Sequence, residues 1–84
     1  MKKLTLQQPT KSLTIELIYA LPEEQELIII QTPLGTTVKQ AIEQSGILTK
    51  YPEIDLASTK VGIFSKVTKL DEELRDGDRI EIYR

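Results

Sequence analysis

The sequence predicts an α+β fold in which one helix packs across one face of a mixed sheet of four to five strands. Three observations support this prediction: apolar residues alternate in 12–20, one amphipathic helix lies near the middle, and a polar turn precedes an alternating segment at 79–83. A chain of 84 residues is long enough for one small domain, which we expect at residues 12–84. Residues 1–11, rich in Gln, Thr and Lys, are expected to form a flexible leader.

Two strands are expected to open the domain as an antiparallel hairpin. In residues 12–20 the apolar side chains that alternate with polar ones should face the core: Leu13, Ile15 and Leu17. A turn separates this strand from a second one at residues 27–32, which are rich in β-branched side chains. If the polar Gln31 faces solvent, the alternation predicts that Leu27 and Ile29 face solvent with it.

A helix is expected after this hairpin. Thr37 as the N-cap and Gln40 three residues later fit a capping box, in which each side chain bonds the other residue's backbone N–H. Gly46 is placed to end the helix in the left-handed conformation. The expected inward stripe follows helical spacing: Val38, Ala41, Ile42 and Ser45. This stripe would cover one face of the sheet.

The middle of the chain is less regular. Residues 47–56 are expected to form an irregular connector with buried anchors. Residues 60–64 predict a third strand, with Phe64 on the face opposite to its apolar neighbours. A tight turn at residues 65–66 then leads into a brief edge strand at 67–70.

Two turn features introduce the last strand. Leu70 and Leu74 are four residues apart, which suits a short helical turn. The segment Asp76-Gly-Asp78 predicts a tight turn, because Gly77 adopts positive φ without steric cost and Asp side chains bond nearby N–H groups. The connection lengths allow the last strand, 79–83, to lie parallel beside the first at the centre of the sheet. This is the ubiquitin-like β-grasp arrangement.

Composition and charge exclude several classes of function. Eleven Lys and Arg against thirteen Asp and Glu give a formal net charge of −2, so we expect no binding to nucleic acid. The sequence has no Cys and no His, so neither a catalytic thiolate nor an imidazole base is expected, and no cofactor or metal site is predicted. No segment approaches the ~20 apolar residues of a membrane span. We therefore expect no membrane insertion and a cytoplasmic location.

Acidic residues gather at 23–26 and 71–78. Paired carboxylates could support acid–base or metal chemistry. Beside turns, however, such side chains are usually solvated or hold the loop, and residues 76–78 lack the spacing of an EF-hand loop. With no base to activate a hydroxyl nucleophile, we expect that the protein is not an enzyme.

The sheet face that the helix leaves uncovered is the candidate site for a partner. It is expected to carry an apolar centre with two orienting charges: Ile18, Phe64 and Tyr83, with Arg79 and Glu81. An alternative is that Ile18, Phe64 and Tyr83 are scattered surface side chains, which are normal in soluble proteins, or are covered by the leader.

The second strand is expected at a sheet edge, where Leu27 and Ile29 belong to an uncharged apolar run. Such an edge predicts a homodimer, formed either by pairing of edge strands or by exchange of the first hairpin. An alternative is that Glu23, Glu24 and Glu26 act as repulsive gatekeepers beside the run.

Three segments together resemble the RnfH family, uncharacterised bacterial ubiquitin-related proteins of the UPF0125 type. They are residues 35–47 (Gly-Thr-Thr-Val-Lys-Gln-Ala-Ile-Glu-Gln-Ser-Gly-Ile), residues 51–64 with Tyr-Pro-Glu-Ile-Asp-Leu and Lys-Val-Gly-Ile-Phe, and residues 70–83. The resemblance implies a β-grasp fold like that of the sulfur carriers of thiamin and molybdopterin synthesis, without an established activity. Members of the family usually continue past Tyr-Arg into a basic tail, so the resemblance implies a shortened chain or a natural variant.

The sequence therefore predicts a non-enzymatic module that binds an unidentified protein partner. The alternative is a relative of the sulfur carriers. Such carriers are activated at a C-terminal Gly-Gly, whereas this sequence ends in Tyr83-Arg84, which disfavours the alternative.

Overall fold

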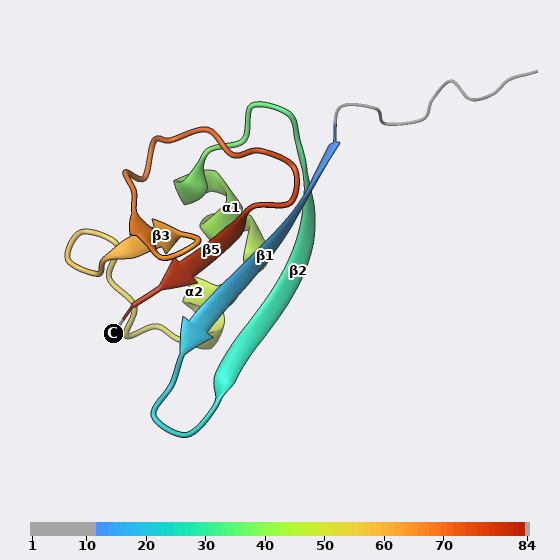
Figure 1. Cartoon of the computed structure of the whole chain (residues 1–84). Helices are drawn as coiled ribbons and strands as arrows, with labels where there is room; N and C mark the ends of the chain where they lie inside the picture. The colour runs from blue at the N-terminus through green and yellow to red at the C-terminus, as the bar shows by residue number, and fades with distance from the viewer. Residues whose placement is uncertain (1–11, 84) are drawn as a thin grey trace, which may run out of the picture.

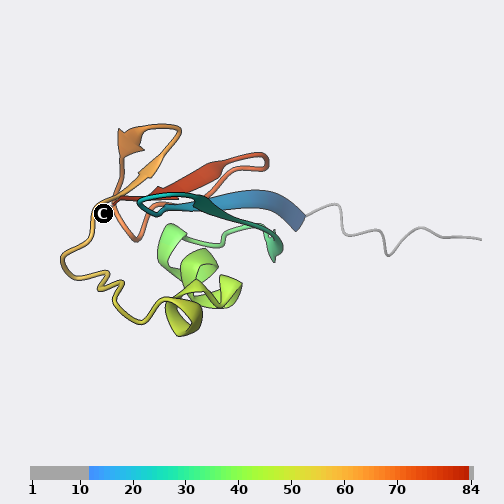
Figure 2. The same ribbon diagram turned by 90° about the horizontal axis from the view of Figure 1, so that it is seen from below.

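The computed structural model describes residues 12–83, which form a five-stranded mixed sheet with its helices on one face (Figure 1, Figure 2). The strand order is β2-β1-β5-β3-β4. The elements are β1 (Ser12–Ala20), β2 (Gln25–Pro33), α1 (Val38–Ser45), α2 (Ile47–Lys50), β3 (Val61–Ile63), β4 (Lys66–Val67) and β5 (Arg79–Ile82). The predicted fold class is confirmed. The leader predicted at residues 1–11 lies outside the described residues.

The first strand lies between its two partners, as predicted. β1 pairs antiparallel with β2 from Ser12 opposite Pro33 to Ala20 opposite Gln25. On its other side β1 pairs parallel with β5, with Leu17 opposite Ile80. Parallel neighbours need a crossover connection, and here the helices and the β3–β4 hairpin provide it.

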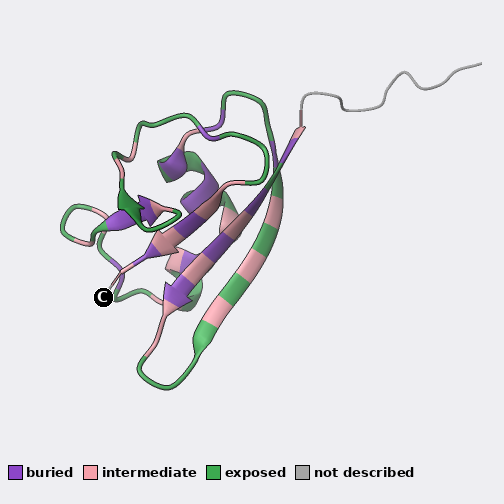
Figure 3. Ribbon diagram, viewed as in Figure 1, coloured by how far each residue is buried: buried purple, intermediate pink, exposed green. Residues whose placement is uncertain are grey.

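The core lies between the sheet and the helices (Figure 3). Alternation along β1 and β5 buries one side of each strand, and α1 contributes the predicted stripe except for the partly buried Ser45. The buried apolar residues are Leu13, Ile15, Leu17, Tyr19, Val38, Ala41, Ile42, Ile47, Ile54, Val61, Leu74, Ile80 and Ile82. Removing these side chains from water is the main stabilising contribution to the fold.

Both predicted ends of α1 are confirmed. The Thr37 hydroxyl accepts a hydrogen bond from the Gln40 amide at 3.3 Å, and the Gln40 side chain accepts one from the Thr37 amide at 3.0 Å. Gly46 follows the helix with φ of +83°, in the left-handed region. Local sequence cues thus decide where this helix begins and ends.

The predicted turn before β5 is also confirmed, and it fastens β5 to β1. Gly77 has φ of +88°. Its amide donates to the Thr14 carbonyl at 2.9 Å, while the Asp76 carboxylate accepts from the Thr14 amide at 2.8 Å. The Asp78 carboxylate accepts from the Arg75 amide at 2.8 Å, which closes the turn.

The connector predicted at residues 47–56 is not wholly irregular, because it starts with the single-turn helix α2. Ile47 is fully buried, and its amide donates to the Ser45 hydroxyl at 3.1 Å. One helical turn is too short to display a hydrophobic period, which is why the sequence did not reveal it.

The helical turn predicted from Leu70 and Leu74 is wrong. A single turn at residues 70–71, closed by a hydrogen bond from the Glu72 amide to the Lys69 carbonyl at 3.2 Å, stands in its place. The backbone around this turn binds the start of α1: the Leu70 carbonyl accepts from the Lys39 amide, and the Leu74 amide donates to the Thr36 carbonyl, each at 2.9 Å. The backbone groups needed for a helical turn are therefore engaged with another element.

The position predicted for Phe64 is also wrong. β3 ends at Ile63, which pairs with Lys66, so the two-residue turn of the hairpin is Phe64-Ser65 and not Ser65-Lys66. Both turn residues have positive φ, +49° and +72°. Such turns normally use Asn and Gly, so Phe and Ser gave no signal for this one.

Candidate functional site

The face of the sheet opposite the helices is uncovered among residues 12–83 (Figure 2). Residues directly opposite each other in neighbouring strands share a face. Ile18 lies opposite Leu27 on one side and Glu81 on the other, so these side chains share the uncovered face. By the same register Glu16 shares it with Ile29 and Arg79. We call this surface the open face.

Arg79 and Glu16 neutralise each other on the open face. The Arg79 Nε donates to the Glu16 Oε1 at 2.9 Å, and their side chains are 43% and 39% exposed. An ion pair so exposed contributes little to stability. Its main effect is on the pattern of charge that the face presents.

Glu81 is the acceptor for two groups of the same face. Its Oε1 accepts from the Tyr83 hydroxyl at 2.8 Å and from the Ser65 amide at 3.0 Å. The hydrogen bond to Glu81, helped by partial desolvation, raises the pKa of Tyr83 above its ordinary value. Within residues 12–83 no cation pairs with Glu81, so its negative charge stays uncompensated.

A shallow hollow of about 230 Å³ lies on the open face beside the end of β1. Four of the five predicted face residues are among those that line it: Ile18, Arg79, Glu81 and Tyr83. The fifth, Phe64, is 56% exposed but belongs to the β3–β4 turn and does not line the hollow. The structure therefore brings the β1 and β5 residues together around the hollow; the Phe64 amide donates to the Arg79 carbonyl at 3.2 Å, but Phe64 does not line the hollow.

Gly62 belongs to this site but escaped prediction. It pairs with Glu81, and a Cβ atom built there would lie 2.5 Å from the Tyr83 hydroxyl and 2.7 Å from the Lys66 carbonyl oxygen. Only glycine allows Tyr83 to lie so close to the strand. A glycine within a strand often marks such a close approach, and that was the signal available in the sequence.

The predicted edge residues lie where the alternation placed them. β2 is an edge of the sheet, and Leu27 and Ile29 are 54% and 60% exposed. Self-association through these residues stays a prediction.

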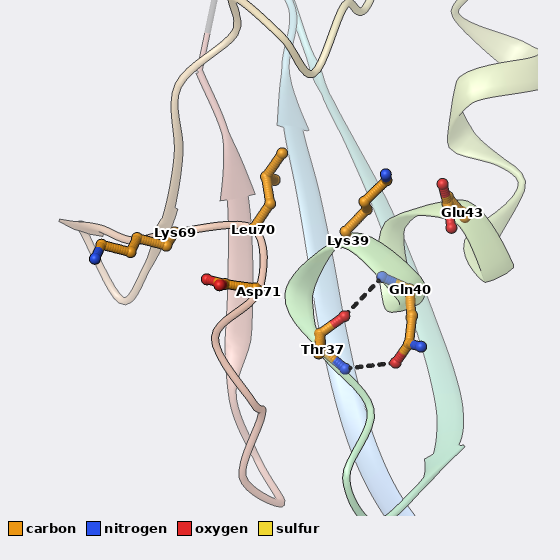
Figure 4. A pocket seen from close by; sticks show the side chains of 7 residues that line it. All are labelled: Thr37, Lys39, Gln40, Glu43, Lys69, Leu70 and Asp71. Carbon is orange, nitrogen blue, oxygen red and sulfur yellow. Dashed lines mark hydrogen bonds between the residues drawn. The ribbon is translucent and has the colours of Figure 1, made fainter.

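A larger hollow of about 710 Å³ lies between the start of α1 and the segment before β5 (Figure 4). Lysines and acids both line it, including Lys39, Glu43 and Asp71. The helix amides beside it are already bonded: Val38 and Lys39 donate to backbone carbonyls at 2.9 Å, and Gln40 donates to the cap. The helix therefore offers no open N–H group here for an anion.

At the tip of the first hairpin, a polar cluster joins β2 to α2. Glu26 accepts from the Lys50 ammonium at 2.8 Å and from the Tyr51 hydroxyl at 2.9 Å. The bond from Lys50, followed by that from Tyr51, lowers the pKa of Glu26. The Tyr51 ring meets the edge of Tyr19 at a centroid distance of 5.0 Å. This cluster holds the hairpin on the core.

Among residues 12–83, no group of three or more His, Cys, Asp or Glu side chains is arranged to hold a metal ion. No helix in this part of the chain has the length and apolar character needed to cross a membrane.

The chain matches a family model and many curated proteins. The model of the RnfH family of ubiquitin-like proteins matches residues 13–84. Protein RnfH of Paraburkholderia phymatum is 54% identical over 72 residues, which are 86% of this chain and 66% of the relative. A UPF0125 protein of Vibrio vulnificus is 53% identical over 70 residues, covering 83% and 60%. The chain thus spans about two thirds or less of the length of these relatives.

Solved structures share the fold, and two of them are informative. One is described as "Putative molybdopterin converting factor, subunit 1" from Pyrococcus furiosus, with a TM-score of 0.63, 21% identity and coverage of 84% of this chain and 95% of the other. This likeness shows the fold alone. The other, protein HI0395 of Haemophilus influenzae, crystallised as a domain-swapped dimer; it is 53% identical with a TM-score of 0.60, covering 87% and 91%. By sequence and fold, the chain belongs to the RnfH family of ubiquitin-like proteins.

Proposed function

We propose that this protein is a non-enzymatic interaction module that binds a partner protein on its open face. One observation carries the proposal: residues from β1 and β5 line a hollow on a sheet face that no helix covers within residues 12–83. The hollow combines apolar and charged side chains, as the centre of a protein interface often does. The lack of Cys and His in the sequence supports a role without catalysis.

Charge indicates the chemistry of the partner. Because Arg79 is paired with Glu16, the unpaired charge at the hollow is that of Glu81. Ile18 and Ala20 supply an apolar wall. We therefore expect the partner to insert an apolar side chain next to a Lys or Arg that pairs with Glu81.

The test is capture of partners from the native cell with three matched chains. Glu81→Gln keeps an acceptor for Tyr83 and Ser65 but removes the charge, and Leu34→Ala removes an apolar side chain, 60% exposed, from outside the open face. We expect the wild type and Leu34→Ala to retain the same stoichiometric protein. Glu81→Gln should lose about tenfold in affinity, and added salt should weaken the wild-type complex.

Two outcomes would reject this proposal. Equal affinity of Glu81→Gln and wild type for every captured protein would remove the open face from the binding site. Recovery of the chain with a carboxylate oxygen replaced by sulfur, seen in its intact mass, would favour the sulfur-carrier alternative.

A second proposal concerns self-association, and the domain-swapped dimer of the HI0395 relative favours it. We infer that this chain also self-associates; exchange of the β1–β2 hairpin is one of two routes open to it, and pairing of β2 edges is the other. That hairpin contacts the rest of the sheet only through the pairing of its strand β1 with β5. Gly35, in the segment that follows the hairpin, has φ of +95°. A dimer that persists on dilution and dissociates only on unfolding would support exchange.

A further inference from the structure

The outer edge of β2 carries unpaired backbone groups, and their identity follows from the hydrogen bonds of β1. The Glu16 amide donates to the Asp78 carbonyl at 3.0 Å, so the backbone groups of Glu16 point toward β5. Those of Thr14 bond Asp76 and Gly77 on the same side. Because successive residues of a strand point their N–H and C=O groups to opposite sides, the odd-numbered residues of β1 face β2.

This assignment decides which groups of β2 are free. The partners of the odd-numbered residues of β1 are the even-numbered residues of β2, so its odd-numbered residues point outward. The outward N–H donors are those of Gln25, Leu27, Ile29 and Gln31. An independent contact agrees, because the Gln31 carbonyl accepts from the Gln44 side chain at 2.9 Å and is therefore not directed at β1. Pro33, which has no N–H, occupies an outward position.

The two edges of the sheet differ in how they are protected. β4 is only two residues long and includes Lys66, two features that discourage pairing with other chains. β2 is nine residues long, and between Leu27 and Gln31 it has no charge and no proline. Its exposed side chains Leu27 and Ile29 adjoin the free donors. The β2 edge is therefore the better template for an added strand.

We propose that β2 pairs antiparallel with β2 of a second copy of this chain, with the two-fold axis at Ile28. Leu27 then lies opposite Ile29 of the second copy, and Gln25 lies opposite Gln31. This register is independent of the binding proposed for the open face and needs no exchange of segments.

Two features of β2 select this register. An axis at Ile29 forms as many backbone hydrogen bonds, because the Gln25 amide then donates to the Pro33 carbonyl, but it sets Leu27 opposite the polar Gln31. The axis at Ile28 instead joins the exposed Leu27 and Ile29 side chains of both copies on one surface, while the Gln31 carbonyl accepts from Gln25 of the second copy as well as from Gln44. It also sets Glu26 opposite Ile30, so the acidic hairpin tips of the two copies stay apart. The edge is thus complementary to itself, as a two-fold interface requires.

Two single-cysteine variants test the register, since the sequence has no Cys of its own. Ile28 and Ile30 are both partly buried on the same side of β2. In the proposed dimer residue 28 faces residue 28 of the second copy, within the range that a disulfide bridges. Residue 30 lies about 13 Å from residue 30 of the second copy, which is too far. Under mild oxidation, Ile28→Cys should give disulfide-linked dimer about ten times faster than Ile30→Cys.

A backbone variant tests the same edge without cross-linking. Ile29→Pro removes an outward donor and leaves the bonds to β1, whereas Ile29→Thr keeps the donor. Light scattering at rising concentration should show a two-chain mass for wild type and Ile29→Thr, and a one-chain mass for Ile29→Pro. Circular dichroism should show the wild-type spectrum for both variants, which checks that each is folded.

Several results would overturn the proposal. One is a wild-type chain that stays monomeric at millimolar concentration; another is equal cross-linking of the two Cys variants. A dimer that survives Ile29→Pro would assign self-association to hairpin exchange or to another surface. Protection of the Leu27 and Ile29 amides from hydrogen exchange only when a different protein is added would assign the edge to a foreign strand.

Discussion

The two faces of the sheet come from the same strands but differ in what covers them. Along β1, Leu17 is fully buried beneath the helices while the next residue, Ile18, is half-buried on the open face. Along β5, Ile80 is buried beneath the helices and the next residue, Glu81, is half-buried on the open face. We therefore expect the two faces to separate stability from recognition: side chains on the covered face hold the fold, and side chains on the open face are proposed to meet a partner.

The largest expected effect tests this separation directly. Leu17→Ala leaves a cavity under α1 and should lower the free energy of unfolding by about 3 kcal/mol. Ile18→Ala, one residue away on the open face, should cost less than about 1 kcal/mol. Urea denaturation of both variants measures the difference. Similar costs would mean that Ile18 belongs to the core and would remove it from the binding face.

Gly62 is the position where the separation should fail. Although it lies on the open face, Gly62→Ala would press a methyl group against the Tyr83 hydroxyl and the Lys66 carbonyl. Because the Lys66 contact is with backbone, the strand must shift, and we expect a loss of about 2 kcal/mol in unfolding free energy.

The double variant Gly62→Ala/Tyr83→Phe separates the contributions of the hydroxyl contact and the backbone contact to this loss of unfolding free energy. It removes the hydroxyl contact and keeps the backbone one, so a partial recovery of stability should be seen relative to Gly62→Ala alone. In Gly62→Ala itself, displacement from Glu81 should return the pKa of Tyr83 toward its ordinary value, which ultraviolet titration reports. An unchanged stability and titration would show that Tyr83 does not pack on Gly62 in solution.

The fold was predictable where its cues are local. Thr37 and Gln40 specify the start of α1 and Gly46 its end, and alternation specifies which side of β1 is buried. The failures have physical reasons: α2 is a single turn without a period, and Phe64-Ser65 takes a conformation that sequence reasoning assigns to glycine.

The candidate site was predictable only in part. Alternation placed Ile18, Arg79 and Glu81 on one face, because that property depends on strand period alone. The pairing of Arg79 with Glu16 joins residues 63 positions apart in the sequence. The hollow likewise depends on how Tyr83 lies over Gly62. Contacts of this kind follow from tertiary packing and have no local signal.

A smaller expected effect concerns an unsatisfied hydroxyl on the covered face. The Thr32 side chain is buried, and its hydroxyl has no hydrogen-bond partner among the described residues. Thr32→Val keeps the shape and removes the unsatisfied group, so it should raise the free energy of unfolding by about 1 kcal/mol. Thr36→Val is the matched control, because the Thr36 hydroxyl donates to the Pro33 carbonyl at 2.7 Å. It should be destabilising, and a destabilised Thr32→Val would contradict the assignment.

The smallest expected effect lies at the rim of the covered face, where Glu26 accepts from Lys50. This bond sets the folded-state pKa of Glu26 below its ordinary 4.5. A carboxyl with a lowered pKa stabilises the fold above its unfolded-state pKa, and this contribution is lost as pH falls through the folded-state pKa. The Tm of wild type should therefore exceed that of Glu26→Gln at neutral pH, and the difference should shrink below pH 4.5.

Lys50→Met supplies the control for this titration, because it keeps an aliphatic side chain and removes the cation. In the Lys50→Met background, the Tm difference between the chain with Glu26 and the chain with Glu26→Gln should depend less on pH. Since the Glu26–Lys50 pair is exposed to solvent, added salt should also reduce the pH-dependent Tm difference in the chain that keeps Lys50. A Tm difference that stays constant through the acid range would show that the Lys50 bond does not hold in solution. The hairpin tip would then be held by the hydrogen bond from the Tyr51 hydroxyl to Glu26 and by the packing of Tyr51 against Tyr19.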